Sequence, residues 1–332
     1  MKPIVQLAPM LGLIDSTLIN AFALIGGFDE IFMPYMLADN RSIPKSAVLG
    51  HRFDGISNKK LIVPQLLGTD ANAVCKISDM LFDLGYTKVS WNMGCPQPFV
   101  TKHGRGAAML LNLDATARLI DAVLPRLKPQ LSIKTRLGYH SPDEFADVIK
   151  MFNKFCINEI VVHARTAVQM YDGKADKQLF AEVARLSVNK VVYNGDIVFA
   201  DDVASLSFPQ LKGYMIGRGA LINPLIGKQM HGVVTPPSEQ KRLFRQLCAS
   251  VTDSYAATGG RGCINRLKEL WKYFAQAFSL PDEVLVRLMA VSNIDTFRLA
   301  TEEIFSNFEL VCANGGIRTS GTNCPSTRRS QS

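Results

Sequence analysis

Short apolar runs alternate with longer amphipathic stretches along the first 235 residues of the chain. Eight of the runs are almost continuously apolar, which is typical of parallel strands buried on both faces. The predicted strands cover residues 4–10, 30–36, 61–68, 88–96, 131–138, 159–166, 190–197 and 212–221. Between them lie helical stretches, some with clear start signals at Asp70 and at Ser141-Pro142. Eight βα units predict an α/β fold, a TIM (β/α)8 barrel, whose usual length is about 250 residues.

A doubly wound parallel sheet is the alternative fold for this alternation. That fold more often carries a Gly-rich turn after its first strand, and the corresponding stretch here, APMLGLIDS, contains no GxGxxG motif. The barrel is therefore assigned to residues 1–235. From Pro236 the spacing is helical without strand runs, which predicts an appended all-helical domain over residues 236–311. Residues 312–332 are rich in Gly, Ser, Thr and Asn and are predicted to be disordered.

Composition narrows the class of protein only a little. The 332 residues include 37 Lys and Arg against 29 Asp and Glu, and this net charge of +8 permits a polyanionic partner without identifying one. The N-terminus lacks the apolar run of a signal peptide or membrane span, so no membrane partner is expected. The seven cysteines include no CxxC pair, which predicts neither a metal site nor a disulfide framework. A reducing cytoplasm is the expected location.

Polar residues gather at the carboxyl ends of the predicted strands, where the loops of a TIM barrel form the active site. They comprise Gln65, Asn92, Cys95, Lys134, Arg136, His163, Arg165, Asn194-Gly195-Asp196 and Gly217-Arg218-Gly219. Cys95 lies in a turn-forming Gly-Cys-Pro, whereas a structural thiol usually sits among branched apolar residues. A cysteine with an ordinary pKa of about 8.5 is mostly protonated at neutral pH, so Cys95 can serve as a proton donor.

Two glycine motifs, NGD after the seventh strand and GRG after the eighth, predict a phosphate site, because glycine lets backbone N–H groups approach an anion closely. Lys134 lies inside an apolar strand and needs a partner, since a buried unpaired ammonium is costly. That partner is either an internal carboxylate or an anionic cofactor. His163 is either a satisfied core histidine or a member of the same site.

The motifs APM, QLLG, NMGCP, GRGAAML, IKTRLG, HART, NGDI and IGRGAL occur in this order between residues 4 and 226. In this series the chain resembles the tRNA-dihydrouridine synthases, an FMN-dependent family, of the bacterial type. NxGCP with the downstream GxGAA is the most specific part of the resemblance. The resemblance implies an FMN-bound barrel that uses NADPH, with NADH as the alternative, to reduce the 5,6 double bond of a D-loop uridine in tRNA. A monomer is the expected assembly.

The resemblance also implies roles for individual residues. Cys95 would give a proton to C5 of the uracil after hydride from reduced FMN has reached C6. Cofactor contacts would come from Pro9, Met10, Leu11, Gln65, Lys134, His163, Asn194, Gly195, Asp196, Gly217 and Arg218. The tRNA would be faced by Asn92, Arg136 and Tyr171 in the barrel and by Arg266 and Lys268 in the helical domain. For Arg266 and Lys268 the alternative is an ordinary amphipathic helix with solvated charges and inward aromatic residues.

Two positions depart from the family pattern. Many members carry a lysine soon after GCP, where this chain has Phe99, and Lys102, His103 or Arg105 is the candidate replacement. Trp91 stands where an aliphatic residue is usual. Two alternative functions stay open: an FMN-dependent oxidoreductase acting on a free pyrimidine, and an RNA-binding protein whose barrel has lost catalysis. The sequence does not identify which D-loop uridine is modified.

Overall fold

The computed structural model describes residues 2–40, 49–50, 53–258 and 262–311. Its strand segments are β1 Ile4–Leu7, β2 Glu30–Phe32, β3 Met36–Leu37, β4 Ile62–Val63, β5 Gln65–Leu67, β6 Lys88–Asn92, β7 Gln130–Arg136, β8 Glu159–His163, β9 Val191–Asn194 and β10 Leu211–Ile216. All of their pairings are parallel. The predicted tail, residues 312–332, lies outside the described residues.

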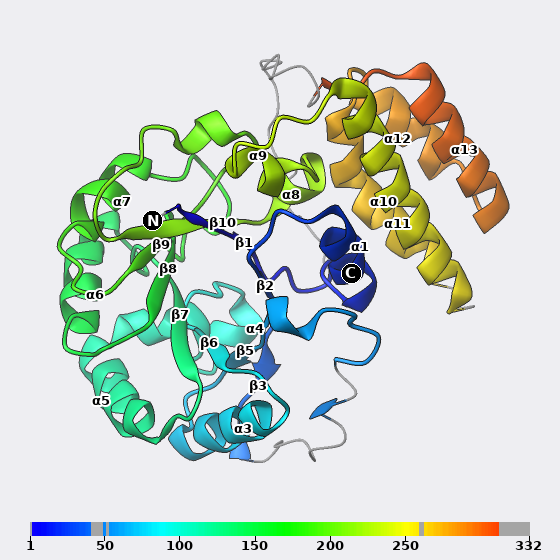
Figure 1. The fold of residues 1–332 in the computed structure, drawn as a ribbon. Helices are drawn as coiled ribbons and strands as arrows, with labels where there is room; N and C mark the ends of the chain where they lie inside the picture. Colours follow the sequence, from blue (N-terminus) through cyan, green and yellow to red (C-terminus); the bar gives the residue numbers. More distant parts are fainter. Residues whose placement is uncertain (1, 41–48, 51–52, 259–261, 312–332) are drawn as a thin grey trace.

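The ten segments form eight strands of a barrel. β2 and β3 belong to one strand interrupted around Pro34, and β4 and β5 to the next strand, interrupted at Pro64. Proline has no N–H to give to a ladder, which explains breaks at these positions. Because β2 pairs with β4 and β3 pairs with β5, the order β3-β5-β6-β7-β8-β9-β10-β1-β2-β4 closes on itself in chain order. The predicted TIM barrel is confirmed (Figure 1).

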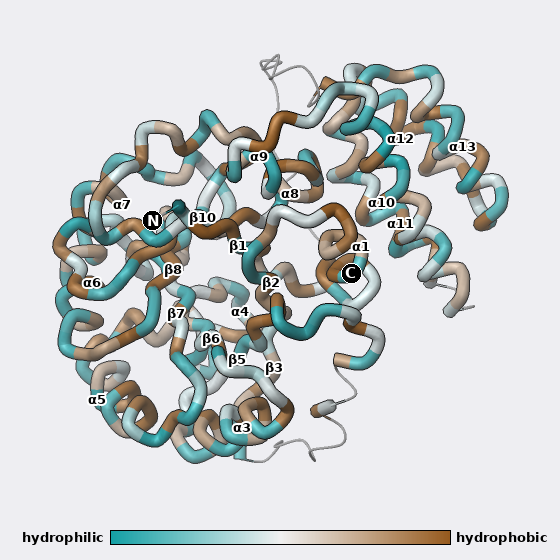
Figure 2. The backbone as a smooth tube through the Cα atoms, viewed as in Figure 1, coloured by the Kyte–Doolittle hydropathy of each residue, from teal (hydrophilic) through white to brown (hydrophobic). Residues whose placement is uncertain are grey.

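The helices of the barrel cover the outside of the ring of strands, except the short α4, which lies in the loop after β6 (Figure 1). They are α1 Ser16–Ile25, α3 Ala71–Asp83, α4 Pro98–Thr101, α5 Leu113–Val123, α6 Phe145–Phe152, α7 Lys177–Ala184, α8 Arg218–Ile222 and α9 Ile226–Met230. The predicted start signals are confirmed: Asp70 caps α3, and Ser141 forms a capping box with Glu144 ahead of α6. Figure 2 shows the strands as largely hydrophobic and the outer helix surfaces as mixed.

The barrel interior has an apolar layer and a charged layer. Ala8, Phe32, Val63, Val161, Val192 and Met215, one from each of six strands, form a separate buried cluster. Near the amino ends of the strands, Glu159 lies between Lys88 at 2.5 Å and Lys212 at 2.5 Å, and Lys88 also pairs with Glu30 at 2.7 Å. Gln6 donates to both carboxylates. Because this end of a TIM barrel contributes to stability, we assign the ion-pair network a structural role and not a catalytic one.

Four further helices follow the barrel: α10 Pro237–Ala257, α11 Cys263–Phe274, α12 Pro281–Met289 and α13 Ile294–Asn307. They pack on one another, with α10 against α1 and α11 against α8, to one side of the barrel (Figure 1). Their apolar residues join the barrel core in one continuous cluster. The change of pattern at Pro236 coincides with the start of α10. The division into domains 1–235 and 236–311 stays a prediction.

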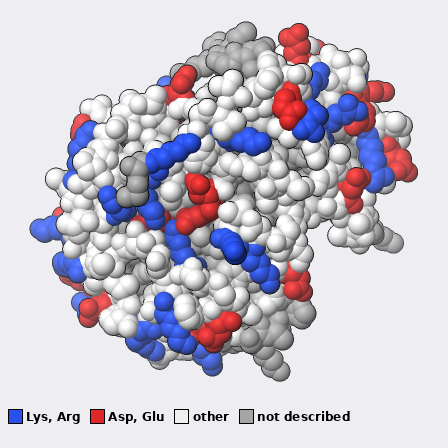
Figure 3. All heavy atoms as spheres, in the orientation of Figure 1, with Lys and Arg blue, Asp and Glu red and all other residues white. Residues whose placement is uncertain are grey.

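Within the described ranges, no helix is both long enough and apolar enough to cross a bilayer. Basic and acidic side chains are interspersed over the face drawn in Figure 3, on the barrel and on the C-terminal helices alike.

Candidate active site

The loop that carries Cys95 is fixed by the side chain of Asn92, the last residue of β6. Asn92 Oδ1 accepts hydrogen bonds from the backbone N–H of Gly94 at 3.1 Å and of Cys95 at 2.9 Å. An asparagine that bonds the backbone two or three residues on is a compact way to form a turn. Asn92 Nδ2 in turn donates to Gln65 Oε1 at 2.9 Å, and Gln65 Nε2 donates to Ser90 Oγ at 3.0 Å.

Two of the expected site residues belong to this chain of hydrogen bonds. Asn92 is only 7% exposed and both ends of its amide bond to the protein, and its contact with RNA stays a prediction. Gln65 is buried and bonds to both Asn92 and Ser90, and its contact with a cofactor likewise stays a prediction. Both residues hold the Cys95 loop in place.

The basic loop after Cys95 folds back onto the cysteine. Ala107 N–H donates to the Cys95 carbonyl at 2.9 Å. Gly106 has a φ of +60°, and a Cβ at this position would lie 2.6 Å from the same carbonyl oxygen. The GxGAA motif is therefore explained by close backbone contact with the cysteine turn. Cys95 itself is half-buried.

The Cys95 thiol experiences opposing influences on its pKa. Burial raises the pKa above its ordinary value. A hydrogen bond from the backbone of Gln97, the charges of Arg136 and Lys134, and a hydrogen bond with the Tyr35 side chain act in the opposite direction. The balance keeps the pKa raised, so Cys95 is a protonated thiol at neutral pH, as a proton donor must be.

Cationic side chains surround His163 at the end of β8. Burial, followed by the charges of Arg136, Lys134, Arg165 and Arg218, lowers the pKa of His163 well below its ordinary value, so the ring is neutral. Arg165 Nη1 lies 3.1 Å from His163 Nε2. A guanidinium has no acceptor, so Nε2 must accept this hydrogen bond and the ring proton resides on Nδ1.

Lys134 is paired by the register of β7 with Val161 of β8, two residues before the pair of Arg136 and His163. Its Nζ donates to Asn194 Oδ1 at 3.0 Å, and Asn194 Nδ2 donates to the Met215 carbonyl at 2.8 Å. Burial, and to a lesser extent the charge of Arg136, lowers the pKa of Lys134 from 10.5 to about 7. The partner is therefore an amide, and among the described residues no carboxylate forms an ion pair with Lys134. Asn194 acts by orienting Lys134.

Arg136 is one of the residues expected to face the RNA, and that contact stays a prediction. The side chain is only 2% exposed, and its guanidinium donates to the carbonyls of Gly94 at 2.8 Å, Thr166 at 2.6 Å and Met170 at 2.8 Å. These three acceptors belong to two loops, one after β6 and one after β8. A buried guanidinium needs such acceptors, so Arg136 holds the two loops together at the barrel mouth.

Tyr171 is the exposed aromatic residue of this region, with 39% of its surface accessible. Its ring lies 4.9 Å from the Arg218 guanidinium and 5.6 Å from that of Arg136, both within cation–π range. The His163 ring centroid is 6.0 Å away. Tyr171 thus presents an exposed ring beside two guanidinium groups, and its contact with RNA stays a prediction.

The two glycine motifs do bring backbone close together. A Cβ on Gly219 would lie 1.7 Å from the Ile197 carbonyl oxygen, and Gly195 has a φ of +148°. The Asp196 carboxylate accepts hydrogen bonds from Arg165 at 2.7 Å and from the Ala175 N–H at 2.8 Å. Its side chain is therefore engaged by the protein, and its contact with a cofactor stays a prediction.

At the end of β1, Pro9 and Met10 are partly exposed and Leu11 is 57% exposed. This exposure leaves an apolar edge on the mouth that is available to a ring system. A Cβ on Gly217 would lie 3.6 Å from Ala8 and 3.8 Å from the Met10 sulfur, so the GRG turn directly adjoins this edge.

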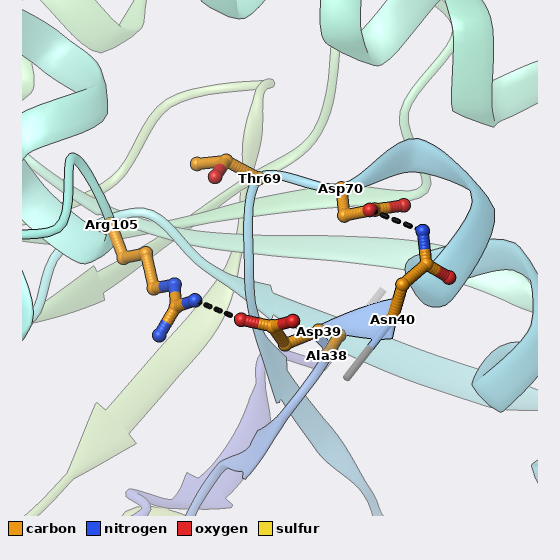
Figure 4. A pocket seen from close by; sticks show the side chains of 6 residues that line it. All are labelled: Ala38, Asp39, Asn40, Thr69, Asp70 and Arg105. Carbon is orange, nitrogen blue, oxygen red and sulfur yellow. Dashed lines mark hydrogen bonds and ion pairs between the residues drawn. The ribbon is translucent and has the colours of Figure 1, made fainter. Parts of the chain in front are cut away.

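A polar cavity of about 330 Å³ adjoins the Cys95 loop at the same end of the barrel (Figure 4). Arg105 reaches across it to Asp39 at 2.5 Å, and Asn40 bonds to Asp70. Arg105 is one of the candidates to replace the missing lysine after GCP, and its charge is engaged by Asp39. Phe99, which occupies the lysine position, is 54% exposed on α4.

Trp91, which stands where an aliphatic residue is usual, lies in the core of the barrel. It is fully buried, and its indole N–H donates to the Gly68 carbonyl at 3.0 Å. Burying a tryptophan requires a partner for this N–H, and the turn after β5 supplies it.

Arg266 and Lys268 are not free surface cations. Arg266 donates to the Leu13 carbonyl at 2.9 Å and to Asp15 at 3.2 Å, so it ties α11 to the barrel. Lys268 donates to the Met289 carbonyl at 2.8 Å. Trp271 and Phe274 on the same helix are buried, which supports the alternative of an ordinary amphipathic helix for α11.

Sequence reasoning missed two residues of the site. Tyr35, in the interruption between β2 and β3, reaches the Cys95 side chain. Arg165, noted as polar but given no role, bonds both His163 and Asp196. For Tyr35 the available signal was a hydroxyl at the carboxyl end of the second predicted strand. In the described part of the chain, no cluster of side chains suits a metal ion.

Fold and site together define a parallel-barrel enzyme whose mouth carries a half-buried thiol, a neutral histidine and several basic side chains. Residues 6–286 match the family described as Dihydrouridine synthase (Dus). The chain belongs to this family and is an oxidoreductase of the tRNA-dihydrouridine synthase type.

Individual relatives agree with this assignment. A tRNA-dihydrouridine(16) synthase of Neisseria meningitidis is 27% identical over 331 residues, covering 93% of this chain and 95% of the relative. A probable tRNA-dihydrouridine synthase of Rhodobacter capsulatus is 30% identical over 66% of this chain and 68% of the relative. A tRNA-dihydrouridine(16) synthase of Pseudomonas putida is 30% identical over 68% of this chain and 72% of the relative.

Proposed function

We propose that this protein reduces the 5,6 double bond of a D-loop uridine in tRNA, with FMN in the barrel mouth and NADPH as the reductant. The observation that carries the proposal is the excess of basic side chains at the mouth. Lys134, Arg136, Arg165 and Arg218 all act on His163, and of these Arg165 and Arg218 share one carboxylate, that of Asp196. A phosphorylated cofactor that becomes anionic on reduction would compensate these charges.

The residues present fit such a cofactor. Pro9, Met10 and Leu11 offer the apolar edge for its ring, while Lys134 and the Nδ1–H of His163 offer donors for the polar atoms of the ring. The backbone N–H groups of residues 195–196 and 217–218 would hold the phosphate, with Arg218 beside them. Bound FMN, once reduced by NADPH, supplies the hydride that uracil C6 requires.

The chain's own chemical contribution is proton donation. Addition of hydride at C6 of uracil leaves an enolate conjugated with the C4 carbonyl, and C5 must then receive a proton. The Cys95 thiol is protonated at neutral pH and presented in a loop that Asn92 fixes. The S–H bond breaks, a C–H bond forms at C5, and the electron pair stays on sulfur as a thiolate.

The tRNA must present an unstacked base, because a uridine inside folded tRNA cannot enter the mouth of a barrel. Tyr171, flat and exposed between two guanidinium groups, is the side chain that we assign to the base. We propose position 16 as the target. The Neisseria relative named for that position matches 93% of this chain, a share that reaches beyond the barrel into the C-terminal helices.

Arg266 contributes to this proposal by fixing the C-terminal helices on the barrel, and so setting the surface on which tRNA lies. Contact of Lys268 with the phosphate backbone would require its ammonium group to leave the Met289 carbonyl or to share it. We expect a cytoplasmic monomer.

Substrate size is the test. The purified protein, loaded with FMN, is given NADPH with either dihydrouridine-free tRNA or free uracil, and NADPH oxidation is followed at matched concentrations. Oxidation that depends on tRNA supports the proposal. NADPH oxidation that depends on uracil would instead indicate a free pyrimidine as the substrate. No NADPH oxidation with either substrate would indicate a barrel that has lost catalysis.

A further inference from the structure

Two side chains of the C-terminal helices reach the loop that links β1 to α1, residues 8–15. Tyr255, on α10, is only 8% exposed, and the side chain of Arg266, on α11, is 25% exposed. Both bond to groups of this loop, although more than 230 residues separate them from it in the sequence. Figure 1 shows α10 beside α1, which starts directly after the loop.

The contacts converge on Asp15, the last residue of the loop. Its Oδ1 accepts from the Leu18 N–H at 3.1 Å and so caps α1. Its Oδ2 accepts from the Tyr255 hydroxyl at 2.6 Å and from Arg266 Nη2 at 3.2 Å, and the Tyr255 oxygen accepts from Arg266 Nε at 3.2 Å. Burial, followed by the hydrogen bond to Asp15, raises the pKa of Tyr255, so its hydroxyl is protonated and donates. A carboxylate, a phenol and a guanidinium thus bond to one another in a closed ring.

A further contact of Arg266 leads from this ring toward the barrel mouth. Arg266 Nη2 donates to the Leu13 carbonyl at 2.9 Å. The Leu13 N–H donates to the Met10 carbonyl at 3.0 Å, and the Ile14 N–H donates to the same oxygen at 2.9 Å. Gly12, with a φ of +82°, permits the tight turn between them. The guanidinium is therefore linked to Met10 through one intervening residue.

Met10 lies at the mouth of the barrel, next to the second glycine motif. A Cβ on Gly217 would lie 3.8 Å from the Met10 sulfur. Pro9, Met10 and Leu11 are the side chains that we assign to the flavin ring. Residues 8–15 lie in neither a helix nor a strand, so the contacts of the turn decide where this apolar edge sits. Several of those contacts come from the C-terminal helices.

A guanidinium suits this position, because its N–H groups lie in one plane and can bond several acceptors at once. Nε and Nη2 of Arg266 bond a hydroxyl, a carboxylate and a backbone carbonyl. Hydrogen bonds between charged groups are about twice as strong as neutral ones. Since most of the Arg266 side chain is withdrawn from solvent, water replaces these contacts only in part when the guanidinium is removed.

We propose that Arg266 is a positioning residue for the cofactor site: through Leu13 it fixes the turn that carries Met10 and Leu11, and Tyr255 holds its guanidinium in place. The inference rests on the proposed function for the identity of the cofactor, FMN. Arg266 itself touches neither cofactor nor substrate in this assignment. The C-terminal helices then have two roles, as a surface for tRNA and as a support for the flavin edge.

The first measurement follows the loop without any cofactor. Amide hydrogen exchange is recorded by mass spectrometry on the cofactor-free full chain, for peptides that span residues 8–18. Wild type is compared with Arg266→Met, with the milder Tyr255→Phe and with the matched control Arg298→Met. Arg298 also belongs to the C-terminal helices, but its ion pair with Asp253, at 2.8 Å, joins α13 to α10 and stays within these helices.

The second measurement is the Kd for FMN, obtained from the change in flavin fluorescence as FMN is titrated with the same proteins. Arg266→Met is expected to speed exchange in residues 10–14 about tenfold and to raise the FMN Kd about tenfold, the effect of losing one strong hydrogen bond. Tyr255→Phe keeps the aromatic ring and loses one contact, so about a threefold change in both is expected. Arg298→Met should match wild type in both.

Comparison with tRNA binding separates a positioning role from a merely structural one. If Arg266 only held the helices on the barrel, Arg266→Met would raise the KM for tRNA and leave the FMN Kd unchanged, and this result would overturn the inference. Unchanged exchange in residues 10–14, or an equal change in Arg298→Met, would also overturn it. If Arg266→Met does not fold, the same criteria apply to Tyr255→Phe.

FMN binding also separates this inference from the proposed function. If the variants weaken FMN binding as expected but wild type reduces no tRNA, the proposed function is wrong and the role of Arg266 stands. If wild type reduces tRNA and the FMN Kd does not respond to Arg266 or Tyr255, the inference alone is wrong.

Discussion

Replacing Lys134 with Met tests whether the positive charge of the barrel mouth is uncompensated before an anion binds. Lys134 is partly buried and has an amide partner rather than a carboxylate, and its pKa is lowered from 10.5 to about 7, first by burial and then by Arg136. An unfolded lysine takes up a proton as the pH falls through 10.5, whereas this folded lysine does so only near 7. The cofactor-free protein therefore loses stability over that interval.

The size of the effect follows from the two pKa values. Between pH 10 and pH 7 the linkage relation gives an upper limit of about 3.5 kcal/mol for the loss of unfolding free energy. Partial hydration of the ammonium reduces this limit, and we expect about 2 kcal/mol. In Lys134→Met the proton uptake is removed. The other titrating groups are shared by both proteins, so the difference between variant and wild type isolates the lysine.

The assay is urea unfolding of the cofactor-free protein at pH 7 and at pH 10. Relative to wild type, the stability of Lys134→Met is expected to improve by about 2 kcal/mol on going from pH 10 to pH 7. The loss of the Asn194 hydrogen bond is nearly the same at both pH values and cancels. Lys128→Met is the matched control, because the Lys128 side chain is 50% exposed and its nearest carboxylate oxygens are 3.8 Å and 3.9 Å away.

Addition of FMN should reverse the ranking, because the anion stabilises wild type and the variant lacks the charge that receives it. A difference between Lys134→Met and wild type that is the same at pH 7 and pH 10 would refute the reasoning, since it would mean that Lys134 titrates normally in the folded state.

Two other substitutions test the supports of the site. Asn92→Ala removes the acceptor of two backbone N–H groups. We expect it to destabilise the fold by about 3 kcal/mol and to speed the alkylation of Cys95. An unchanged alkylation rate would contradict the role of Asn92 in the turn. Glu159→Gln is expected to cost about 3 kcal/mol at pH 7 by urea unfolding. Burial raises the pKa of Glu159, but Lys88 and Lys212 outweigh burial and leave the pKa lowered. The cost of the substitution therefore fades as the pH falls through this lowered pKa. A cost no larger than that of the surface variant Glu239→Gln would count against the buried network.

The barrel could be predicted because buried parallel strands leave continuous apolar runs in the sequence, and the spacing of those runs fixes the number of βα units. Each of the eight predicted strands corresponds to a strand of the barrel. The breaks at Pro34 and Pro64 were not predicted, since the apolar runs continue across both prolines. Helix starts at Asp70 and Ser141 were predictable, because capping depends on residues close in sequence.

The depth of each side chain in the site was less predictable. Sequence places Gln65, Asn92 and Arg136 at the carboxyl ends of strands, but burial there depends on which loops fold over the barrel. Three carbonyls from distant loops cover Arg136, and no local pattern encodes such a contact. Tyr35 and Arg165 were missed for the same reason, because their partners are brought to them by closure of the barrel.

The most direct test of the central claim maps dihydrouridine in tRNA. Dihydrouridine-free tRNA is incubated with NADPH, FMN and either the wild-type protein or Cys95→Ala, and the modified position is located by mass spectrometry. The account predicts dihydrouridine at position 16 with wild type, the position named for the Neisseria relative, and little or none with the variant. Steady NADPH oxidation by the flavin-loaded protein with no dihydrouridine in either sample would contradict it.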